Sequence, residues 1–539
     1  MNIKKALINF FLSSIFYNYL INRNQLREIS FTPPDPWPGD PVLGENFFQG
    51  HYNLAGKKVF SPKDPVWKVP EKDINWQSEM NSFFWLRHLK ARSGSLARRH
   101  ARYLIINWIE INNKWNETSW QIDILARRVS SWITNISFLL AEKDEDFSLK
   151  IRKSLLKQIK HLNNFANQRY FATLDRDFGI QESAIKKAQI IRGLLLSAIC
   201  FSGQEVKIKK TLALLKSEIL NDLNQEGIHK SRSPYTQLSV LANLITIRDA
   251  LVTASLEVPI LLNDSVQKMS HALRFFRNIN GTLAIFNGSK KGEKFVIDKI
   301  LSEADGKVRA KGPTSLSDSG FEKLSVSNVN IFIDTLSSKN NIRSKCPHSI
   351  EIGVGKTRLL GSCGSVHGKS AQWKKLLMSS SAHSVLIVED TNAFSGIDSK
   401  QQTLTKRYKK DGSEIIELIH YGYYNRYSAI CSRSIELGED GKNIAGLDEI
   451  ISEKFNKFAI RFHFSPDIKI SISRDNKSAM IATNEQGWVF IFKGNANLNL
   501  DSSVFVEDSG KISNSHQLVL NGQTANKKTS ILWGFKRKT

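Results

Sequence analysis

The sequence predicts an α+β multidomain chain in which helices come first and an antiparallel β structure follows. Between about residues 81 and 280, apolar residues recur at helical spacing and proline is almost absent. From Gly281 onward the apolar runs become short, β-branched and separated by Gly, Asn, Asp and Ser. The chain has 539 residues, which is enough for roughly two to four domains, so both parts have room for a core of their own.

The first 80 residues combine an apolar segment with a proline-rich connector. Residues 6–21 follow two lysines in the polarity order of a signal peptide, but four polar residues interrupt them and no A-x-A-like cleavage site follows. The segment is also shorter than the about 20 apolar residues that cross a membrane. We expect either a signal segment or an amphipathic first helix, and no stable membrane span beyond this N-terminal segment. The prolines of residues 31–40 predict a non-helical connector.

The second predicted domain, residues 81–280, is helical. Helices are expected near 95–115, 119–140, 147–174, 180–202, 206–226, 234–256 and 259–278. Their similar lengths and short connections favour antiparallel helical hairpins, arranged as a bundle, a solenoid or a toroid.

The third predicted domain, residues 281–539, is a β-sandwich or a related antiparallel sheet. Its clearest strand is 457–464, where Phe458, Ile460, Phe462 and Phe464 alternate with Ala459, Arg461 and His463. Further strands are expected near 349–354, 384–389, 413–419, 468–472, 478–483 and 488–492.

Composition narrows the function. The chain holds 76 Lys and Arg against 51 Asp and Glu, a net charge of +25, which favours an anionic partner such as a polysaccharide, a nucleic acid or an acidic membrane surface. The basic residues are spread along the chain and no nucleic-acid-binding motif occurs, so we expect no nucleic acid partner. No nucleotide or dinucleotide motif is present, so no cofactor is expected. The four cysteines are predicted to be buried thiols, with a Cys346–Cys363 bridge left open.

Two clusters in the helical part carry candidate chemistry. His229 and Arg232 lie on a helix–helix connection whose next helix opens at Ser233-Pro234; the alternative for His229 is that it caps neighbouring carbonyls. Trp120 with Arg127 and Arg128 suits a charged sugar, because an aromatic ring covers a pyranose face and a guanidinium grips a carboxylate. The alternative for this second cluster is a core tryptophan with solvated arginines.

In the β part, His383 is expected at the mouth of a strand, and His420-Tyr-Gly-Tyr423 at a strand end. Five short motifs follow one another along the chain: Trp-x6-Arg-Arg from Trp120, Gly-x-His-x-x-Arg-Ser-Pro from Gly227, Phe286-Asn-Gly-Ser289, Ala382-His-Ser-Val385 and Ile460-Arg-Phe-His-Phe464. Together with the order of the elements, they resemble the heparinase II/III-like family.

The resemblance implies an incomplete α/α toroid followed by an antiparallel β-sandwich, and cleavage of an acidic polysaccharide by β-elimination. It implies that His229 and Arg232 neutralise a uronate carboxylate or assist the base, and that His383 lines the same cleft from the sandwich side. Tyr235 is a substitute for the family's tyrosine base, since Phe286 stands in the neighbourhood expected for it. His348 joins Trp120, Arg127 and Arg128 as a substrate-binding residue, and no metal ligands can be assembled.

The leading hypothesis is therefore a lyase of a uronate-containing polysaccharide, with the cell envelope or periplasm as the location that the resemblance implies. The alternative is a non-catalytic binding or processing protein for an anionic envelope or capsular polysaccharide. A toroid glycoside hydrolase would need two cleft carboxylates, and the sequence shows no convincing pair. The lyase hypothesis predicts that His229, Arg232 and His383 converge on one site.

Overall fold

The computed structural model divides into two compact units. One comprises Met1–Leu223, Leu238–Gln267 and Asp298–Val308; the other comprises Asn224–Gln237, Lys268–Ile297 and Arg309–Thr539. The three-domain division expected from the sequence stays a prediction. The residues that the structure describes are 3–23, 29–62, 65–70, 73–201, 204–308, 310–336, 346–366, 371–394, 403–525 and 527–538.

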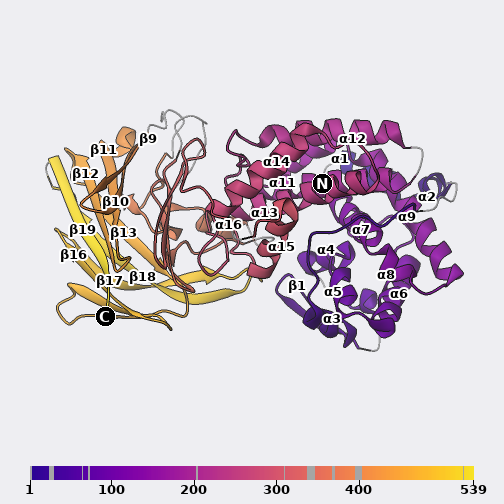
Figure 1. The fold of residues 1–539 in the computed structure, drawn as a ribbon, viewed down its shortest axis with the longest axis horizontal. Helices are drawn as coiled ribbons and strands as arrows, with labels where there is room; N and C mark the ends of the chain where they lie inside the picture. Colours follow the sequence, from indigo (N-terminus) through magenta and orange to yellow (C-terminus); the bar gives the residue numbers. More distant parts are fainter. Residues whose placement is uncertain are drawn as a thin grey trace. The chain divides into compact units, whose positions relative to one another are not determined.

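The first unit is built from helices, drawn from indigo to magenta in Figure 1. Its centre is α7 (Ile122–Thr134) against α11 (Ile180–Ile199), and both helices are buried over most of their length. The amphipathic spacing read from the sequence thus corresponds to real core faces. The other helices of this part are α3 (Pro41–Phe48), α4 (Ile74–Ser82), α5 (Leu86–Arg92), α6 (Gly94–Ile111), α8 (Ile136–Leu140), α9 (Glu145–Phe165), α10 (Gln168–Asp177) and α12 (Glu205–Glu218), with a hairpin of β1 (His51–Leu54) and β2 (Lys57–Phe60).

The N-terminal apolar segment forms two helices instead of one, α1 (Ile3–Ser13) and α2 (Ile15–Asn22). Ser14 separates them, because its side chain accepts a hydrogen bond from the Tyr17 amide and caps the second helix. Within the described part of the chain, no helix is long and apolar enough to cross a membrane.

Three further helices are α13 (Pro234–Thr253), α14 (Ile260–Phe275) and α15 (Lys294–Asp305), and the division between the units falls inside each of them. The third was not expected from the sequence, which predicted sheet from Gly281 onward. Its buried residues Ile297, Ile300, Leu301 and Ala304 follow helical spacing, so a helical signal was present but lay in a region of strand-like composition. The short helix α16 (Ala371–Leu377) was missed in the same region.

The second unit contains two antiparallel sheets, coloured towards orange and yellow in Figure 1. One has the order β14-β15-β16-β19-β12-β11-β10-β9, and the other β17-β18-β13-β7-β6-β5-β4-β3, with β8 also paired to β13. The strands are β3 (Ser315–Leu316), β4 (Phe321–Val326), β5 (Val329–Asp334), β6 (Ile350–Val354), β7 (Thr357–Gly361), β8 (Leu386–Val388), β9 (Thr403–Lys410), β10 (Ser413–Tyr423), β11 (Ala429–Leu437), β12 (Asn443–Ser452), β13 (Lys457–Phe464), β14 (Lys469–Ile472), β15 (Ser478–Ala482), β16 (Gly487–Lys493), β17 (Asn497–Val506), β18 (Ile512–Gln523) and β19 (Lys527–Arg537).

A large apolar core lies within this unit and draws side chains from both sheets. β13 supplies Phe458, Ile460, Phe462 and Phe464 to it, as the alternation in the sequence predicted. Phe462 meets Trp533 of the other sheet with ring centroids 5.0 Å apart. The order of helices first and antiparallel sheets second is therefore confirmed.

All four cysteines are buried and none is in a disulfide, so the prediction of buried thiols is confirmed and the Cys346–Cys363 bridge is absent. Burial raises the pKa of the Cys200 thiol to about 12, which keeps it protonated and inert near neutral pH.

Candidate functional site

The connection before α13 is a tight turn fixed by its own side chains. Gly227 has a φ of +79°, and a Cβ there would lie 2.5 Å from the carbonyl carbon of Lys268, so this position requires glycine. Gln237 in the first turn of α13 accepts a hydrogen bond from the His229 amide (3.1 Å) and donates one to the Gly227 carbonyl (2.6 Å). The turn is thereby tied to the start of the helix.

His229 is buried in this turn, with 1% of its surface exposed. Its Nδ1 accepts a hydrogen bond from the Ser231 amide at 3.1 Å, which places the proton of the neutral imidazole on Nε2. The alternative for His229 was that it caps neighbouring carbonyls, whereas this bond is one that its ring accepts from a backbone amide.

Arg232 is the most constrained of the predicted catalytic residues. Its φ is +52°, a left-handed conformation that costs a non-glycine residue about 1–2 kcal/mol. The guanidinium donates to the carbonyls of Ser319 (2.7 Å) and Gly320 (2.9 Å) and to both carboxylate oxygens of Asp334 (2.6 and 3.3 Å). It also lies 4.3 Å from the centre of the Phe321 ring.

The Asp334 carboxylate thus pairs with the Arg232 guanidinium, which the sequence hypothesis assigned to a uronate carboxylate of the substrate. Both side chains are almost fully buried, at 2% and 3% exposure. Arg232 would have to release Asp334 before it could hold a substrate carboxylate. In this structure it joins the turn before α13 to the residues just before β4 and to the end of β5, all in the same unit.

His383 follows the 3₁₀ turn Ser380–Ala382 and precedes β8, so the predicted strand mouth is confirmed. The side chain is buried, and burial lowers its pKa to about 4, so the imidazole is neutral at pH 7. The pKa of His463 on β13 is lowered to about 3, first by burial and then by the nearby charge of His383.

His463 connects a small buried network that sequence reasoning did not assemble. Its Nδ1 lies 2.8 Å from Ser503 Oγ and 3.5 Å from Cys363 Sγ, and its Nε2 lies 3.0 Å from the Ser381 carbonyl oxygen. These residues come from separate strands and a loop, and no local motif brings them together.

Tyr235 is the predicted catalytic residue whose side chain is only partly buried. Its amide donates to Ser289 Oγ at 2.9 Å, and Asn287 donates from its side chain to the Arg232 carbonyl at 3.2 Å. The Lys290 ammonium lies 5.5 Å from the centre of the Tyr235 ring. Tyr235, Asn287, Ser289 and Lys290 are called the Tyr235 cluster below.

The sequence motif Phe286-Asn-Gly-Ser289 therefore has a structural role, because its loop is bonded to the start of α13. Ser365 reinforces the loop by donating from its hydroxyl to the Gly288 carbonyl at 2.8 Å. The sequence analysis identified this motif but did not identify Lys290. The one feature of the sequence that could have pointed to Lys290 is that it directly follows the motif.

The predicted sugar platform is corrected by the structure. Trp120 is 2% exposed and donates from Nε1 to the Asn112 carbonyl at 3.0 Å, so its ring faces the helical core. Arg128 is fully buried and donates to Gln158 Oε1 (2.7 Å) and to the Ser119 carbonyl (2.9 Å). A ring and a guanidinium in these positions cannot meet a polymer, so the alternative of a core tryptophan describes this site.

Arg127, the third member of that platform, is held by Glu79. Its two terminal nitrogens donate to the two carboxylate oxygens at 2.9 and 2.6 Å, in a bidentate ion pair. Arg127 is only 13% exposed, so it is not a solvated arginine, and its role in binding a sugar carboxylate stays a prediction.

His348 lies inside the second unit and not at a surface. Its ring centroid is 4.6 Å from that of His420, and Arg433 donates to its carbonyl at 2.9 Å. Burial, with the charges of these two neighbours, holds the pKa of His348 well below its usual value. Arg433 itself forms an ion pair with Asp448 at 2.7 Å in which both side chains are 1% exposed. The assignment of His348 to substrate binding is corrected for the same reason as Trp120.

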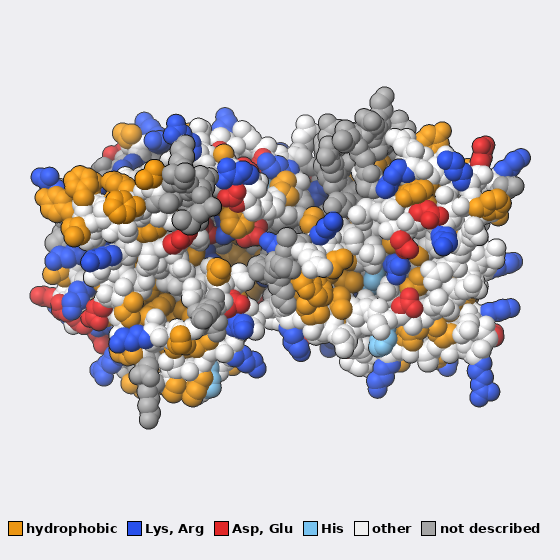
Figure 2. Space-filling view, turned by 180° about the vertical axis from the view of Figure 1, so that it is seen from behind, with side chains coloured by type: hydrophobic (Ala, Val, Ile, Leu, Met, Phe, Trp, Pro, Cys, Tyr) orange, Lys and Arg blue, Asp and Glu red, His pale blue; other side chains and the backbone are white. Residues whose placement is uncertain are grey.

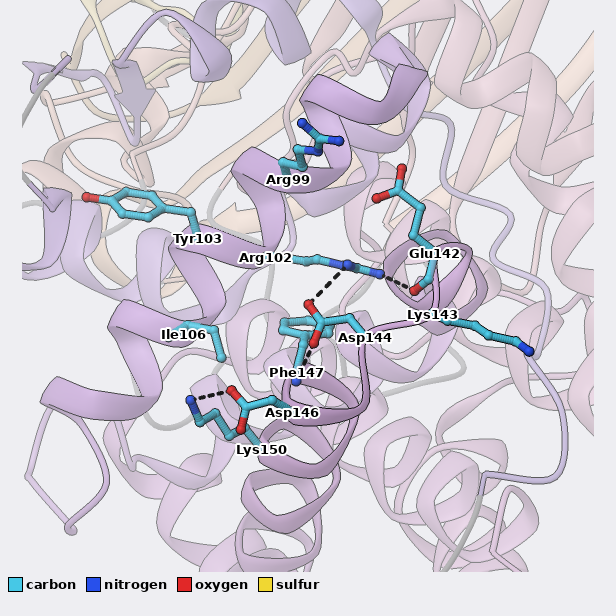
Figure 3. Close-up of a pocket in the computed structure, with 10 residues that line it drawn as sticks. All are labelled: Arg99, Arg102, Tyr103, Ile106, Glu142, Lys143, Asp144, Asp146, Phe147 and Lys150. Carbon is cyan, nitrogen blue, oxygen red and sulfur yellow. Dashed lines mark hydrogen bonds and ion pairs between the residues drawn. The ribbon is translucent and has the colours of Figure 1, made fainter.

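Among the described residues, no group of three or more His, Cys, Asp or Glu side chains is placed to hold a metal ion. A pocket of about 540 Å³ lies in the first unit between α6 and the start of α9, shown in Figure 3. Its charges are largely paired, since Arg102 reaches Asp144 (3.4 Å) and Lys150 reaches Asp146 (2.6 Å). The pocket is lined by Arg99, Arg102, Tyr103, Ile106, Glu142, Lys143, Asp144, Asp146, Phe147 and Lys150.

Residues 309–534 match the family described as "Heparinase II/III-like, C-terminal". This part of the chain is therefore similar to the C-terminal domain of heparinase II/III-like proteins. The resemblance found in the sequence is thereby confirmed, and it extends to solved structures across the whole chain.

Heparinase III is 13% identical, with a TM-score of 0.70 over 96% of this chain and 89% of that one. Heparan sulfate lyase HepC from Pedobacter heparinus is 14% identical, with a TM-score of 0.60 over 97% and 87%. At this identity the likeness shows the fold, so the predicted toroid followed by a β-sandwich is confirmed.

A curated relative is FtsZ-localized protein C from Caulobacter vibrioides (strain NA1000 / CB15N). It is 27% identical over 494 residues, covering 85% of this chain and 82% of that one. Its name states a location and not a reaction. The chain thus has the fold of polysaccharide lyases together with a relative that is not named for lyase activity.

Proposed function

We propose that the protein is a lyase that cleaves a uronate-containing polysaccharide by β-elimination, with Tyr235 as the base. One observation carries this assignment. Of the four residues that the sequence singled out for catalysis, His229, Arg232 and His383 are buried, whereas Tyr235 is partly exposed and lies beside the Lys290 ammonium. The lyase fold supports the reaction class.

The reaction needs a base, an acid and a cation at one place. The C5 proton of a uronate becomes acidic enough to remove when its carboxylate charge is neutralised. Lys290 is the cation of the Tyr235 cluster, and we assign it this role in place of Arg232. The Tyr235 side chain, deprotonated in the reacting form, takes the C5 proton on its phenolic oxygen, a C4–C5 double bond forms as the C4–O4 bond breaks, and O4 takes its proton from solvent water.

The buried residues then act as positioning residues. Arg232 and Asp334 fix the turn from which α13 starts, and the bonds from Asn287 and to Ser289 set the 286–290 loop against Tyr235. This arrangement would hold the phenol and the ammonium at a constant separation, which electrostatic catalysis requires.

The test is turnover by the full chain on a panel of acidic polysaccharides, read as absorbance from new unsaturated chain ends. Tyr235→Phe removes one hydroxyl and should lower kcat by about 10²–10⁴ with little change in stability. Tyr424→Phe is the matched control, because Tyr424 is 52% exposed in the same unit and outside the cluster. Full activity of Tyr235→Phe would exclude Tyr235 as the base.

A second candidate is a protein of the same fold that binds an anionic polysaccharide without cutting it. The observation that favours it is the burial of His229, Arg232 and His383, since three groups expected at the reaction centre are enclosed in protein. Retention on a polysaccharide column together with no unsaturated product from any polymer would select this candidate over the lyase.

A further inference from the structure

The two N-terminal helices expose an unusually apolar surface. Eight large hydrophobic side chains within fourteen residues are at least one-third exposed, and five of them exceed 60%. Figure 2 shows a band of hydrophobic side chains on the left of the view, with Lys and Arg side chains around it. The eight, called the N-terminal apolar surface, are Leu7 (63%), Ile8 (48%), Phe10 (77%), Phe11 (45%), Ile15 (84%), Phe16 (62%), Tyr19 (61%) and Leu20 (38%).

The part of this surface that lies on α2 is anchored to α9 of the same unit. The Tyr17 hydroxyl lies 2.6 Å from His161 Nδ1, and Lys157 donates to the Asn18 side chain at 2.6 Å. Lys160 donates to the Leu20 carbonyl at 2.7 Å and so closes the C-terminal end of α2. Tyr17 and Ile21 are buried, at 3% and 1% exposure, so α2 packs one face inward while the other stays exposed.

We infer that the N-terminal apolar surface docks onto the surface of an anionic lipid bilayer. Aromatic and aliphatic side chains on one face of a helix, with basic residues beside them, are typical of helices that lie in the plane of a membrane interface. Arg23, at the end of α2, and Lys153, on α9, are both exposed, and the chain carries a net charge of +25. The positive charge complements anionic lipid headgroups.

The dimensions favour lying on the bilayer over crossing it. α1 has 11 residues and α2 has 8, so neither helix reaches the about 20 residues that span the hydrocarbon core. The break at Ser14 and the anchoring of α2 to α9 also keep the two helices from forming one continuous span. The inference does not depend on the reaction proposed above.

The test is co-sedimentation of the full chain with vesicles made of an equimolar mixture of phosphatidylcholine and phosphatidylglycerol. Phe10→Glu/Phe16→Glu should weaken binding about 100-fold, because two exposed rings are replaced by charges that lipid repels. Phe60→Glu/Phe455→Glu is the matched control, with the same charge change at rings that are 61% and 66% exposed elsewhere, and it should bind nearly as the parent protein does.

Charge is tested separately. Arg23→Glu/Lys153→Glu should weaken binding to the mixed vesicles and reduce its sensitivity to salt. Binding to vesicles of phosphatidylcholine alone that equals binding to the mixture would overturn the anionic requirement.

Two results would overturn the inference as a whole. One is unchanged vesicle binding by Phe10→Glu/Phe16→Glu. The other is a parent protein that does not sediment with vesicles but dimerises in solution, and becomes monomeric on the same substitution, since the occupant would then be a second copy of the chain.

Discussion

Replacing Arg232 by methionine would separate a structural role for this side chain from a role in substrate binding. Methionine keeps most of the volume and removes the charge and every donor. The substitution leaves the Ser319 and Gly320 carbonyls without their guanidinium donor and leaves the Asp334 carboxylate buried without its cation.

The expected loss follows from the burial of the pair. Breaking a buried ion pair by removing one partner costs about 3–5 kcal/mol, because the remaining charge stays in a medium of low polarity. Both side chains here are at most 3% exposed, so solvent screening does not reduce this figure. Asp334→Asn should cost less, since the amide can still accept one of the guanidinium bonds.

The assay is urea unfolding of the full chain, with hydrogen exchange of the amides in β4 and β5 as a local measurement. Arg232→Met should lower the free energy of unfolding of the second unit by about 3–5 kcal/mol and speed exchange in these strands. In Arg232→Met/Asp334→Asn, the loss should be smaller than the sum of the two single losses by about 1–3 kcal/mol, since the residues are in contact.

One outcome would refute this reasoning. If Arg232→Met unfolds at the same urea concentration as the parent and exchanges no faster, yet no longer binds polysaccharide, Arg232 contacts substrate and its pairing with Asp334 contributes little to stability.

Two further predictions concern the second unit. Burial lowers the pKa of His383 to about 4 in the folded protein, whereas a histidine in the unfolded chain has a pKa of about 6.5. Between these two pH values the unfolded chain binds a proton that the folded protein does not bind, so the free energy of unfolding falls as the pH falls. His383→Gln should therefore reduce the loss in unfolding free energy between pH 7 and pH 5 by about 2 kcal/mol, and an unchanged pH dependence would contradict the burial of a neutral imidazole. Gly227→Ala should destabilise by more than about 1 kcal/mol in thermal unfolding, since it combines a positive φ with a contact to Lys268, whereas Gly510→Ala has a positive φ and open space and should cost less.

The spacing of hydrophobic residues was sufficient to predict the helices and strands that have one apolar and one polar face. β13 was predicted with its observed bounds because Phe458, Ile460, Phe462 and Phe464 alternate with other residues, and the sandwich core uses that face. The predicted helix of residues 6–21 was instead interrupted at Ser14, since capping by a side chain leaves little trace in hydrophobic spacing.

The candidate site was less predictable because its contacts are distant in sequence. Arg232 and Asp334 are 102 residues apart, and nothing near Arg232 signals that a carboxylate already fills its fork. Arg128 was expected outside the core because it is charged, but its hydrogen-bond partners come from three other segments and make burial possible. Tyr235 and Lys290 lie together where Asn287 and Ser289 bond the 286–290 loop to the start of α13 and the residues before it.

The Arg232–Asp334 pair also affects where the chain can be divided. The sequence changes character near Gly281, and the recognisable family domain begins at residue 309, so either position looks like a natural starting point for an isolated sandwich. A fragment that starts there would keep Asp334 and lose Arg232, although residues 224–237 belong to the same compact unit as the sheets. The smallest self-sufficient form of this sandwich therefore includes residues 224–237. This segment ends more than seventy residues before residue 309, where the family domain begins (309 − 237 = 72).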